Sequence, residues 1–541
     1  MQNRVLSRAL LTALLALWLF PVSPSEGAAD YPRRPKLILI LVIDQFRYDY
    51  LVRYRQQFVE GGFNLLLKGG ANFVDCRYDY ASTETGPGHA SLFTGAYGNI
   101  HGIVANEWYD RSLHNAAHCV KDPNTKLLGE PGGMAAVGAS PRNLMGSTIG
   151  DELRAATDFQ SKVIAISLKD RAAILPGGHT ANAVYWADLS TGRFVTSTYY
   201  LSTLPSWVSQ FHEQAAAIKA YCGKAWQALP ETPGAGGRIL KEPAASGIEP
   251  CPGPELMSWI TDTPFMNEVE LNFAREAIKN ERLGQGVTTD LLAVSLSVND
   301  SIGHGFGPYS AEVADTTLRT DHYLAGFFAD LDRLVGLNNV WMALSGDHGV
   351  APTPRFIQEH GLGMGQYKPE TVRVAVEQAL SKAFGEDQWI EYAGGANIYF
   401  NLATLEAHQV DRARAEAVAV EAAVSVPGVH AAFTRSQFLT GTLPNSPVSR
   451  KAANSYNPQR SGDIFLVVRP YAVAAGETGS THGSPWSYDA QVPLILWGSA
   501  FRPGVYAGPC QTIDLAPTLA AALGITQPSG AQGKPLTEAL K

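Results

Sequence analysis

Six residues of the types that bind transition metals are spread along this 541-residue chain, beside apolar runs or in a glycine-containing loop. They are Asp44, Asp300, His304, Asp347, His348 and His482. The set has too much nitrogen for a calcium site and lacks the thiolates of a structural zinc site. Three aspartates and three histidines suit two catalytic zinc ions with three protein ligands each. A single Asp after a strand is usually a helix N-cap, and a single His is usually structural, so this interpretation depends on the whole set.

A candidate nucleophile, Thr85, lies in the run Ala81-Ser-Thr-Glu-Thr-Gly-Pro-Gly-His-Ala-Ser-Leu-Phe-Thr-Gly95. This polar, turn-rich stretch passes into a helix predicted to begin near Pro87 to His89, which places Thr85 at the helix N-terminus. Backbone N–H groups and the helix dipole favour an anion such as phosphate there. A hydroxyl is a weak nucleophile at neutral pH unless a metal ion activates it. Thr85 is therefore a nucleophile if the metal set exists, and an ordinary N-cap otherwise.

Three other side chains are candidates for binding the oxygens of a phosphate group. Lys169 and Arg171 follow an apolar run, and Asn106 lies in the stretch 102–109. An ammonium, an arginine fork and an amide together suit the non-bridging oxygens of phosphate. On composition alone, Lys169 and Arg171 would be solvated surface charges.

Five short runs rich in valine, isoleucine and leucine predict buried parallel strands, at 36–43, 162–168, 291–298, 340–344 and 492–497. Helical stretches such as 316–334 lie between them. The alternation predicts an α/β fold with a central, mostly parallel sheet flanked by helices. Ligands bind such sheets beyond the carboxyl ends of the strands. The acids that follow three of the runs should therefore meet at one edge.

The predicted organisation is a catalytic core interrupted by two insertions that form a cap over this edge. The insertions are 200–265 and 351–478. The core consists of three stretches, 30–199, 266–350 and 479–541. Within the second insertion the residue pattern predicts a helix, a strand and a loop, at 411–424, 464–468 and 444–461 respectively.

The N-terminus has the pattern of a secretory signal, with Arg4 and Arg8 before an apolar run and small residues near 27–29. We expect a signal peptide at 1–29 and a periplasmic or extracellular protein with no membrane segment after cleavage. An uncleaved anchor is the alternative. The formal net charge of −8 and the lack of a basic block argue against a nucleic-acid partner.

The five cysteines have no CxxC spacing, and some of them can pair in an exported protein. They are Cys76, Cys119, Cys222, Cys251 and Cys510. Cys222 with Cys251 is the favoured pair, because these two flank a stretch rich in glycine and proline.

Together these motifs resemble the alkaline phosphatase superfamily, in its nucleotide pyrophosphatase/phosphodiesterase-like branch. Within that branch the sequence is most similar to the PafA-type bacterial alkaline phosphatases with a threonine nucleophile. The residues that carry the resemblance are Val42-Ile-Asp44, Thr85-Gly-Pro-Gly-His89, Asn106, Asp300 with His304, Asp347-His348, and His482. Sulfatases of the superfamily have an arginine where this sequence has His89, which makes a sulfatase a poor match.

The resemblance implies an alkaline phosphatase-like fold and two zinc ions per chain. One zinc would be held by Asp300, His304 and His482; the other would be held by Asp44, Asp347 and His348 and would also bind the Thr85 oxygen. Asn106, Lys169 and Arg171 would contact the phosphate.

The implied activity is that of a secreted alkaline phosphatase that hydrolyses phosphate monoesters through a phosphothreonine intermediate, with secondary phosphodiesterase activity. Its substrates would be small-molecule phosphate esters, and the protein is expected to be a monomer. A phosphodiesterase or nucleotide pyrophosphatase is the alternative. An exported binding protein without turnover is a third reading, and it is disfavoured because a binder needs no threonine at a helix start.

Overall fold

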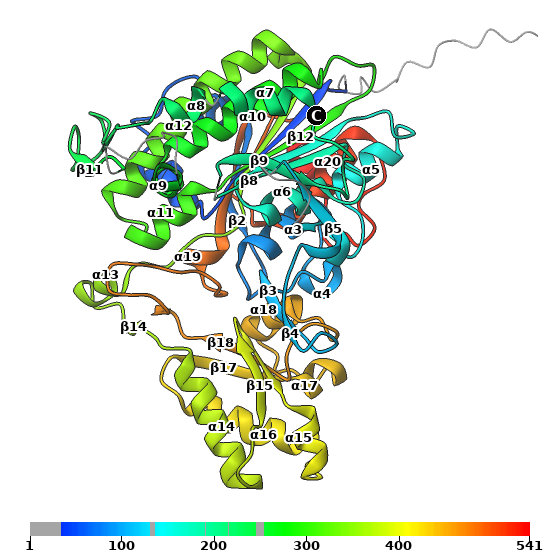
Figure 1. Ribbon diagram of the computed structural model, residues 1–541, viewed down its shortest axis with the longest axis vertical. Helices are drawn as coiled ribbons and strands as arrows, with labels where there is room; N and C mark the ends of the chain where they lie inside the picture. Colours follow the sequence, from blue (N-terminus) through cyan, green and yellow to red (C-terminus); the bar gives the residue numbers. More distant parts are fainter. Residues whose placement is uncertain (1–33, 130–135, 190, 215, 245–253) are drawn as a thin grey trace, which may run out of the picture.

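A twelve-stranded sheet forms the centre of the molecule in the computed structural model (Figure 1), which describes residues 34–129, 136–189, 191–214, 216–244 and 254–541. Its middle is a block of five parallel strands in the order β13-β1-β12-β7-β8. These strands are β13 (Val340–Gly346), β1 (Leu37–Ile43), β12 (Asp290–Leu296), β7 (Val163–Ser167) and β8 (Ala183–Asp188). The predicted α/β class and central parallel sheet are confirmed, and four of the five predicted strands lie in this block.

Helices cover both faces of the block, and strand β1 shows why its sequence is apolar throughout. All seven of its residues are buried. Leu37, Leu39 and Leu41 face one core, which includes the helices α10 (Phe265–Asn280) and α12 (Ala311–Leu334). Ile38, Ile40 and Val42 face the other core, which includes α3 (Thr85–Thr94), α6 (Asp170–Gly177) and α20 (Leu515–Leu523). A strand packed on both sides needs apolar residues at every position, not at alternate ones.

The sheet edges contain antiparallel strands, and here one prediction is wrong. The run 492–497 forms β20 (Gln491–Trp497), but it lies antiparallel to β13 and to β2 (Ala71–Arg77). The chain reaches β20 from the loop that contains His482, at the carboxyl end of the parallel block, so the strand must run back across the sheet. At the other edge, the antiparallel strands are β9 (Arg193–Ser197), β5 (Lys121–Leu128) and β6 (Val137–Ala139).

The second predicted insertion contains a four-stranded sheet with its own hydrophobic core, drawn in yellow and orange below the main sheet in Figure 1. Its strands are β15 (Ile390–Gly394), β16 (Asn397–Phe400), β18 (Ile464–Val468) and β17 (Val429–Thr434), packed with helices α14 (Glu370–Phe384) and α16 (Arg412–Ser425). The predicted helix at 411–424 and strand at 464–468 are confirmed.

The predicted loop at 444–461 is wrong over part of its length, because α18 (Pro447–Ser455) lies within it. Ser446 caps this helix by accepting a hydrogen bond from Ser449, and Pro447 occupies the first helical position. Both are helix-start signals that outweigh the polar composition.

The first predicted insertion packs onto the main core. Trp226 and Ile260 are fully buried in the same cluster as α10 and α12. Cys222 is disulfide-bonded. Its predicted partner, Cys251, lies outside the described ranges. The predicted signal peptide at 1–29 also lies outside them. Cys76, Cys119 and Cys510 are free thiols.

The other described elements are shorter or lie at the periphery. They are α1 (Tyr48–Arg53), α2 (Phe63–Gly69), α4 (Gly98–His101), β3 (Glu107–Asp110), β4 (Asn115–His118), α5 (Ile149–Ala155), α7 (Ser206–Gln214), α8 (Ala216–Lys219), β10 (Trp226–Gln227), β11 (Ile239–Lys241), α9 (Pro254–Ile260), α11 (Val298–Phe306), α13 (Pro354–Glu359), β14 (Gly365–Gln366), α15 (Leu402–Ala407), α17 (Arg435–Thr440), β19 (Ala472–Val473), α19 (Ser487–Ala490), β21 (Gly504–Tyr506) and β22 (Cys510–Gln511). Across the described ranges, none of the helices combines the length and apolar character needed to cross a membrane.

Candidate active site

Three strands of the parallel block end at the same level, and this brings the candidate ligands together. Ile43 of β1 is in register with Leu296 of β12 and with Gly346 of β13. Asp44 and Asp347 follow their strands directly, and Asp300 lies in the first turn of α11, just beyond β12. The edge of the sheet is therefore where the ligand-type residues meet, as their positions in the sequence predict.

Asp44, Asp347 and His348 form one compact group of ligand atoms. His348 Nε2 lies 3.3 Å from Asp44 Oδ1 and 3.6 Å from Asp347 Oδ2. All three side chains are fully buried. Within the described part of the chain, these same three atoms are buried without a hydrogen-bond partner. Buried polar atoms that converge without hydrogen bonds are costly unless a cation binds them, so the group fits a metal ion.

Asp300, His304 and His482 form a second group. The Nε2 atoms of His304 and His482 lie 3.3 and 3.5 Å from Asp300 Oδ1. The other ring nitrogen of each imidazole pairs with a backbone carbonyl: His304 Nδ1 with Ser480 at 2.8 Å and His482 Nδ1 with Thr83 at 2.7 Å. Such partners fix the tautomer so that Nε2 is the atom available to a metal.

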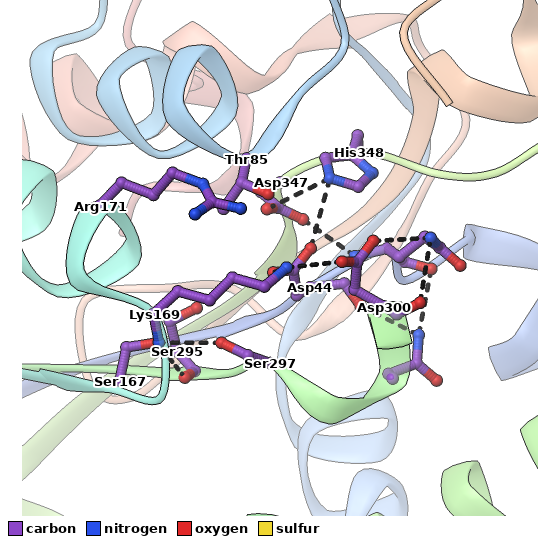
Figure 2. A network of polar contacts seen from close by, with 12 residues as sticks. Asp44, Thr85, Ser167, Lys169, Arg171, Ser295, Ser297, Asp300, Asp347 and His348 are labelled. Carbon is purple, nitrogen blue, oxygen red and sulfur yellow. Dashed lines mark hydrogen bonds and ion pairs between the residues drawn. The ribbon is translucent and has the colours of Figure 1, made fainter. Parts of the chain in front are cut away.

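The two groups are in contact with each other. The rings of His348 and His482 stack with centroids 3.7 Å apart. Lys169 Nζ lies 2.7 Å from Asp44 Oδ2 and 2.5 Å from Asp300 Oδ2, and so bridges one carboxylate of each group. Figure 2 shows this lysine reaching between the two aspartates. Lys169 thus contacts the oxygens opposite those that lie nearest the imidazoles.

The charges in the site shift the pKa values of its groups strongly. Burial opposes the charged form of His348, but Asp347 and Asp44 outweigh it and raise the pKa of the imidazole to about 10. Burial likewise opposes ionisation of Asp347, but His348 and His89 lower the pKa of this carboxyl to about 2. The pKa of Asp300 falls well below its usual value because Lys169 and His304 outweigh burial. The carboxylates of Asp347 and Asp300 are thus ionised, and they favour positive charge beside them.

Thr85 is the first residue of α3 and is 1% exposed. Figure 2 shows it at the start of this helix on the side of Asp347 and His348. The helix starts at Thr85, two residues earlier than predicted. Gly88 allows helix α3 to lie close to Asp347, because a Cβ at this position would lie 2.2 Å from the backbone oxygen of Asp347. The second glycine of the Thr85-Gly-Pro-Gly-His89 motif, Gly88, is therefore required by packing.

Asn106 and Arg171 line one cavity of about 370 Å³ beside the Thr85 helix. Asn106 Oδ1 accepts the Gly86 N–H at 2.8 Å, which leaves its amide NH₂ as the free donor. The Arg171 Nε is buried without a hydrogen-bond partner in the described residues, and Arg171 Nη1 lies 3.9 Å from Asp170 Oδ1. These unsatisfied donors suit an anion.

Residues not predicted from the sequence hold the predicted ones in place. His89 Nε2 pairs with Ser295 Oγ at 2.8 Å, and His89 Nδ1 lies 3.3 Å from Asp347 Oδ2. Glu84 Oε2 accepts the Asn106 backbone N–H at 2.7 Å. Gln45 contacts both Asp300 and Asp347. His89 belongs to the Thr85–His89 motif, whereas Glu84 and Gln45 have no signal in the sequence beyond standing next to a predicted site residue.

The chain belongs to the type I phosphodiesterase/nucleotide pyrophosphatase family, whose sequence profile matches residues 38–489. The resemblance predicted from the motifs is therefore confirmed.

Several curated relatives match almost the whole chain. Alkaline phosphatase PafA of Elizabethkingia meningoseptica is 36% identical over 94% of this chain and 95% of its own length. A Myroides odoratus protein named calcium-transporting ATPase is 34% identical over 98% of both chains. Alkaline phosphatase PhoV of Synechococcus elongatus is 36% identical over 94% of this chain and 93% of its own. The crystal structure of PafA superimposes with a TM-score of 0.86 at 35% identity, covering 94% of this chain and 99% of PafA.

Proposed function

We propose that this protein is an alkaline phosphatase that hydrolyses phosphate monoesters at a two-zinc site with Thr85 as nucleophile. The observation that carries the proposal is the pair of adjoining ligand groups beside the N-terminus of α3. The names of the relatives PafA and PhoV support the same activity.

The donor sets fit zinc. Asp44, Asp347 and His348 would hold one ion, and the orphaned buried atoms of this group need such a cation. The second ion would be held by Asp300, His304 and His482. Bound zinc supplies a Lewis acid that lowers the pKa of a hydroxyl or water and balances charge on phosphate oxygens.

We expect these residues to carry out a two-step displacement. Thr85 Oγ attacks phosphorus and forms a phosphothreonine, while the leaving-group oxygen departs on the side of Asp300, His304 and His482. Water then attacks phosphorus from that side, phosphate leaves, and the Thr85 hydroxyl is restored. In both steps one oxygen attacks phosphorus while another departs on the opposite side. The same arrangement of ligands can therefore serve both steps.

Lys169 and Arg171 favour a monoester, whereas Asn106 is a donor for monoesters and diesters alike. A monoester presents more negative charge than a diester, so two cations stabilise it more. Arg171 and Asn106 line the cavity beside Thr85 with free donors. A weaker phosphodiesterase activity is expected, because the ligands and the nucleophile serve both substrates.

The family's description favours a second candidate, a phosphodiesterase or nucleotide pyrophosphatase with the same ligands. Rates on p-nitrophenyl phosphate and bis-p-nitrophenyl phosphate, measured side by side on zinc-loaded protein, separate the two. We expect the monoester to be faster and Arg171→Ala to reduce that preference at least tenfold. Arg142→Ala, at an arginine 62% exposed, is the matched control and should leave both rates unchanged. A diester preference in the wild-type protein would favour the second candidate.

The proposal also covers where the protein is located, its oligomeric state and its domain boundaries. Export to the periplasm or beyond follows from the pattern at 1–29, and a monomer is expected. The four-stranded sheet within 351–478 reaches the site, because Tyr392 of β15 lines the same cavity as Arg171. The core boundaries 30–199, 266–350 and 479–541 and the insertion 200–265 can be tested by limited proteolysis of the mature protein.

A further inference from the structure

Gln45, which follows Asp44 directly, contacts one aspartate of each candidate metal group. Its side-chain Nε2 donates to Asp300 Oδ1 at 2.6 Å, and its backbone N–H donates to Asp347 Oδ1 at 3.0 Å. The residue is fully buried. We propose that Gln45 is a positioning residue that joins the two groups: its amide orients Asp300 and its backbone orients Asp347. This inference rests on the proposed function insofar as the two groups bind zinc.

The backbone at Gln45 adopts a conformation that few residues other than glycine take. Its φ is +60°, in the left-handed region, at the second residue beyond strand β1. The Asn299 amide Nδ2 stabilises this turn by donating to the carbonyls of Asp44 and Gln45 at 3.0 and 3.1 Å. Strained residues of this kind persist where the surrounding structure holds them and often lie at functional sites. A glycine would relieve the strain but would lose the amide.

Helix α11 is shaped to receive the Gln45 side chain. A Cβ at Gly303 would lie 1.7 Å from Gln45 Oε1, so only glycine at this position lets the amide lie against the helix. The same helix carries Asp300 and His304. By contrast, a Cβ at Gly305 would meet no atom within 4 Å. The absence of a side chain at Gly303 therefore serves the contact with Gln45 and is not a general requirement of the helix.

The consequence for the Asp300 carboxylate is that both of its oxygens are restrained. Gln45 donates to Oδ1, and Lys169 donates to Oδ2 at 2.5 Å. The carboxylate then presents the remaining lone pair of Oδ1 toward the imidazoles of His304 and His482. Partners that orient a ligand in this way typically change metal affinity by 10- to 100-fold when removed.

The two contacts of Gln45 can be separated, because one uses the side chain and the other the backbone. Gln45→Met removes the amide donor and keeps an unbranched side chain of similar length, while the N–H to Asp347 remains. We expect zinc to bind roughly 10- to 100-fold more weakly at the Asp300 group and to change less than threefold at the Asp347 group. Calorimetric titration of zinc into metal-free protein, with a competing chelator, resolves the two affinities. His482→Ala identifies the step that belongs to the Asp300 group.

A second variant reaches the same contact from the other side and needs no change at Gln45. Gly303→Ala displaces the amide, whereas Gly305→Ala adds the same methyl group to the same helix with no contact. Alanine also favours a helix more than glycine does, so neither change should unfold α11. We expect Gly303→Ala to reproduce the selective loss of affinity and Gly305→Ala to bind zinc like the wild-type protein. Thermal unfolding of each metal-free variant reports folding independently of zinc.

The outcomes distinguish the inference from the function on which it rests. Suppose that the wild-type protein binds two zinc ions and that Gln45→Met and Gly303→Ala each bind two zinc ions with unchanged affinity. Gln45 then does not position Asp300. Equal weakening of both steps, accompanied by a lower unfolding temperature of the metal-free protein, would mean that Gln45 only supports the fold. Wild-type protein that binds no zinc would overturn the proposed function together with this inference.

Discussion

The Lys169 ammonium lies 2.5 Å from Asp300 Oδ2, and this contact belongs to a bridge that also reaches Asp44. The lysine side chain is 15% exposed, so the bridge is largely shielded from water. Sequence analysis predicts Lys169 as a contact of the substrate phosphate. Its position shows that it also balances the charge of the carboxylates that would hold the metals.

Replacing Lys169 should therefore affect stability in a metal-dependent way. Lys169→Met leaves two buried carboxylates without their shared cation, and losing one partner of a buried ion pair costs about 3–5 kcal/mol. Zinc would supply the missing charge, so the loss should be smaller when zinc is bound. Urea unfolding with and without zinc measures both values. An equal loss in the two conditions would show that the lysine's charge is not coupled to the metal groups.

Asn106 should matter for monoesters and diesters alike. Its side-chain oxygen is already used by the Gly86 N–H, so the amide NH₂ is the group left for a phosphate oxygen. Asn106→Ala should lower kcat/KM roughly 100-fold on both substrates, which is the usual effect of removing one donor to a developing charge. Asn143→Ala is a matched control, because its amide donates to the Cys119 carbonyl instead. A loss confined to monoesters would assign Asn106 the role proposed for Arg171.

Metal removal should abolish activity reversibly. A chelator should remove two zinc ions per chain, and zinc should restore the rate where calcium does not, because three of the six ligands of the two groups are imidazoles and not calcium-type carboxylates. Elemental analysis beside the assay measures the stoichiometry. His482→Ala should retain at most one tightly bound ion. Full activity in metal-free protein would contradict the two-metal account.

Asp489 should make stability fall as pH rises. Burial raises the pKa of this carboxyl to about 7, against the opposing effect of its hydrogen bonds from Ser484. The unfolded chain releases the proton near pH 4 and the folded protein only near pH 7. The stabilisation present below pH 4 is therefore lost between these values, by at most about 1.4 kcal/mol per pH unit.

Asp489→Asn removes this titration while keeping an acceptor for Ser484. Between pH 5 and pH 7 the free energy of unfolding of the wild-type protein should therefore fall relative to that of the variant. Denaturant unfolding of both metal-free proteins across this range tests it. Parallel pH profiles would show that Asp489 titrates normally in the folded protein.

The positions of the site residues could be predicted because they depend on a local rule. Asp44, Asp300 and Asp347 follow apolar runs, and runs that form adjacent parallel strands must end at one edge. The direction of β20 could not be predicted in this way, because it depends on which side of the sheet the chain enters from. Helix α18 was missed although Ser446 and Pro447 mark its start.

The supporting residues were harder to predict than the ligands. Nothing about a single Gln45 or Glu84 in the sequence indicates which carboxylate or amide it contacts, since those partners come from distant parts of the chain. Likewise, the sequence does not indicate that Lys169 contacts Asp44 and Asp300. Such roles depend on tertiary geometry, whereas the residue types that bind metals can be read directly from the sequence.

Thr85 should form a covalent bond to the phosphoryl group during turnover, and mass spectrometry of protein quenched in acid while it hydrolyses p-nitrophenyl phosphate detects that bond. We predict one phosphoryl group on the peptide that contains Thr85 in the wild-type protein and in Thr85→Ser, and none in Thr85→Ala, whose hydrolysis should be lost. Thr85→Ala protein that is folded, binds two zinc ions and still hydrolyses the ester at the wild-type rate would contradict the account.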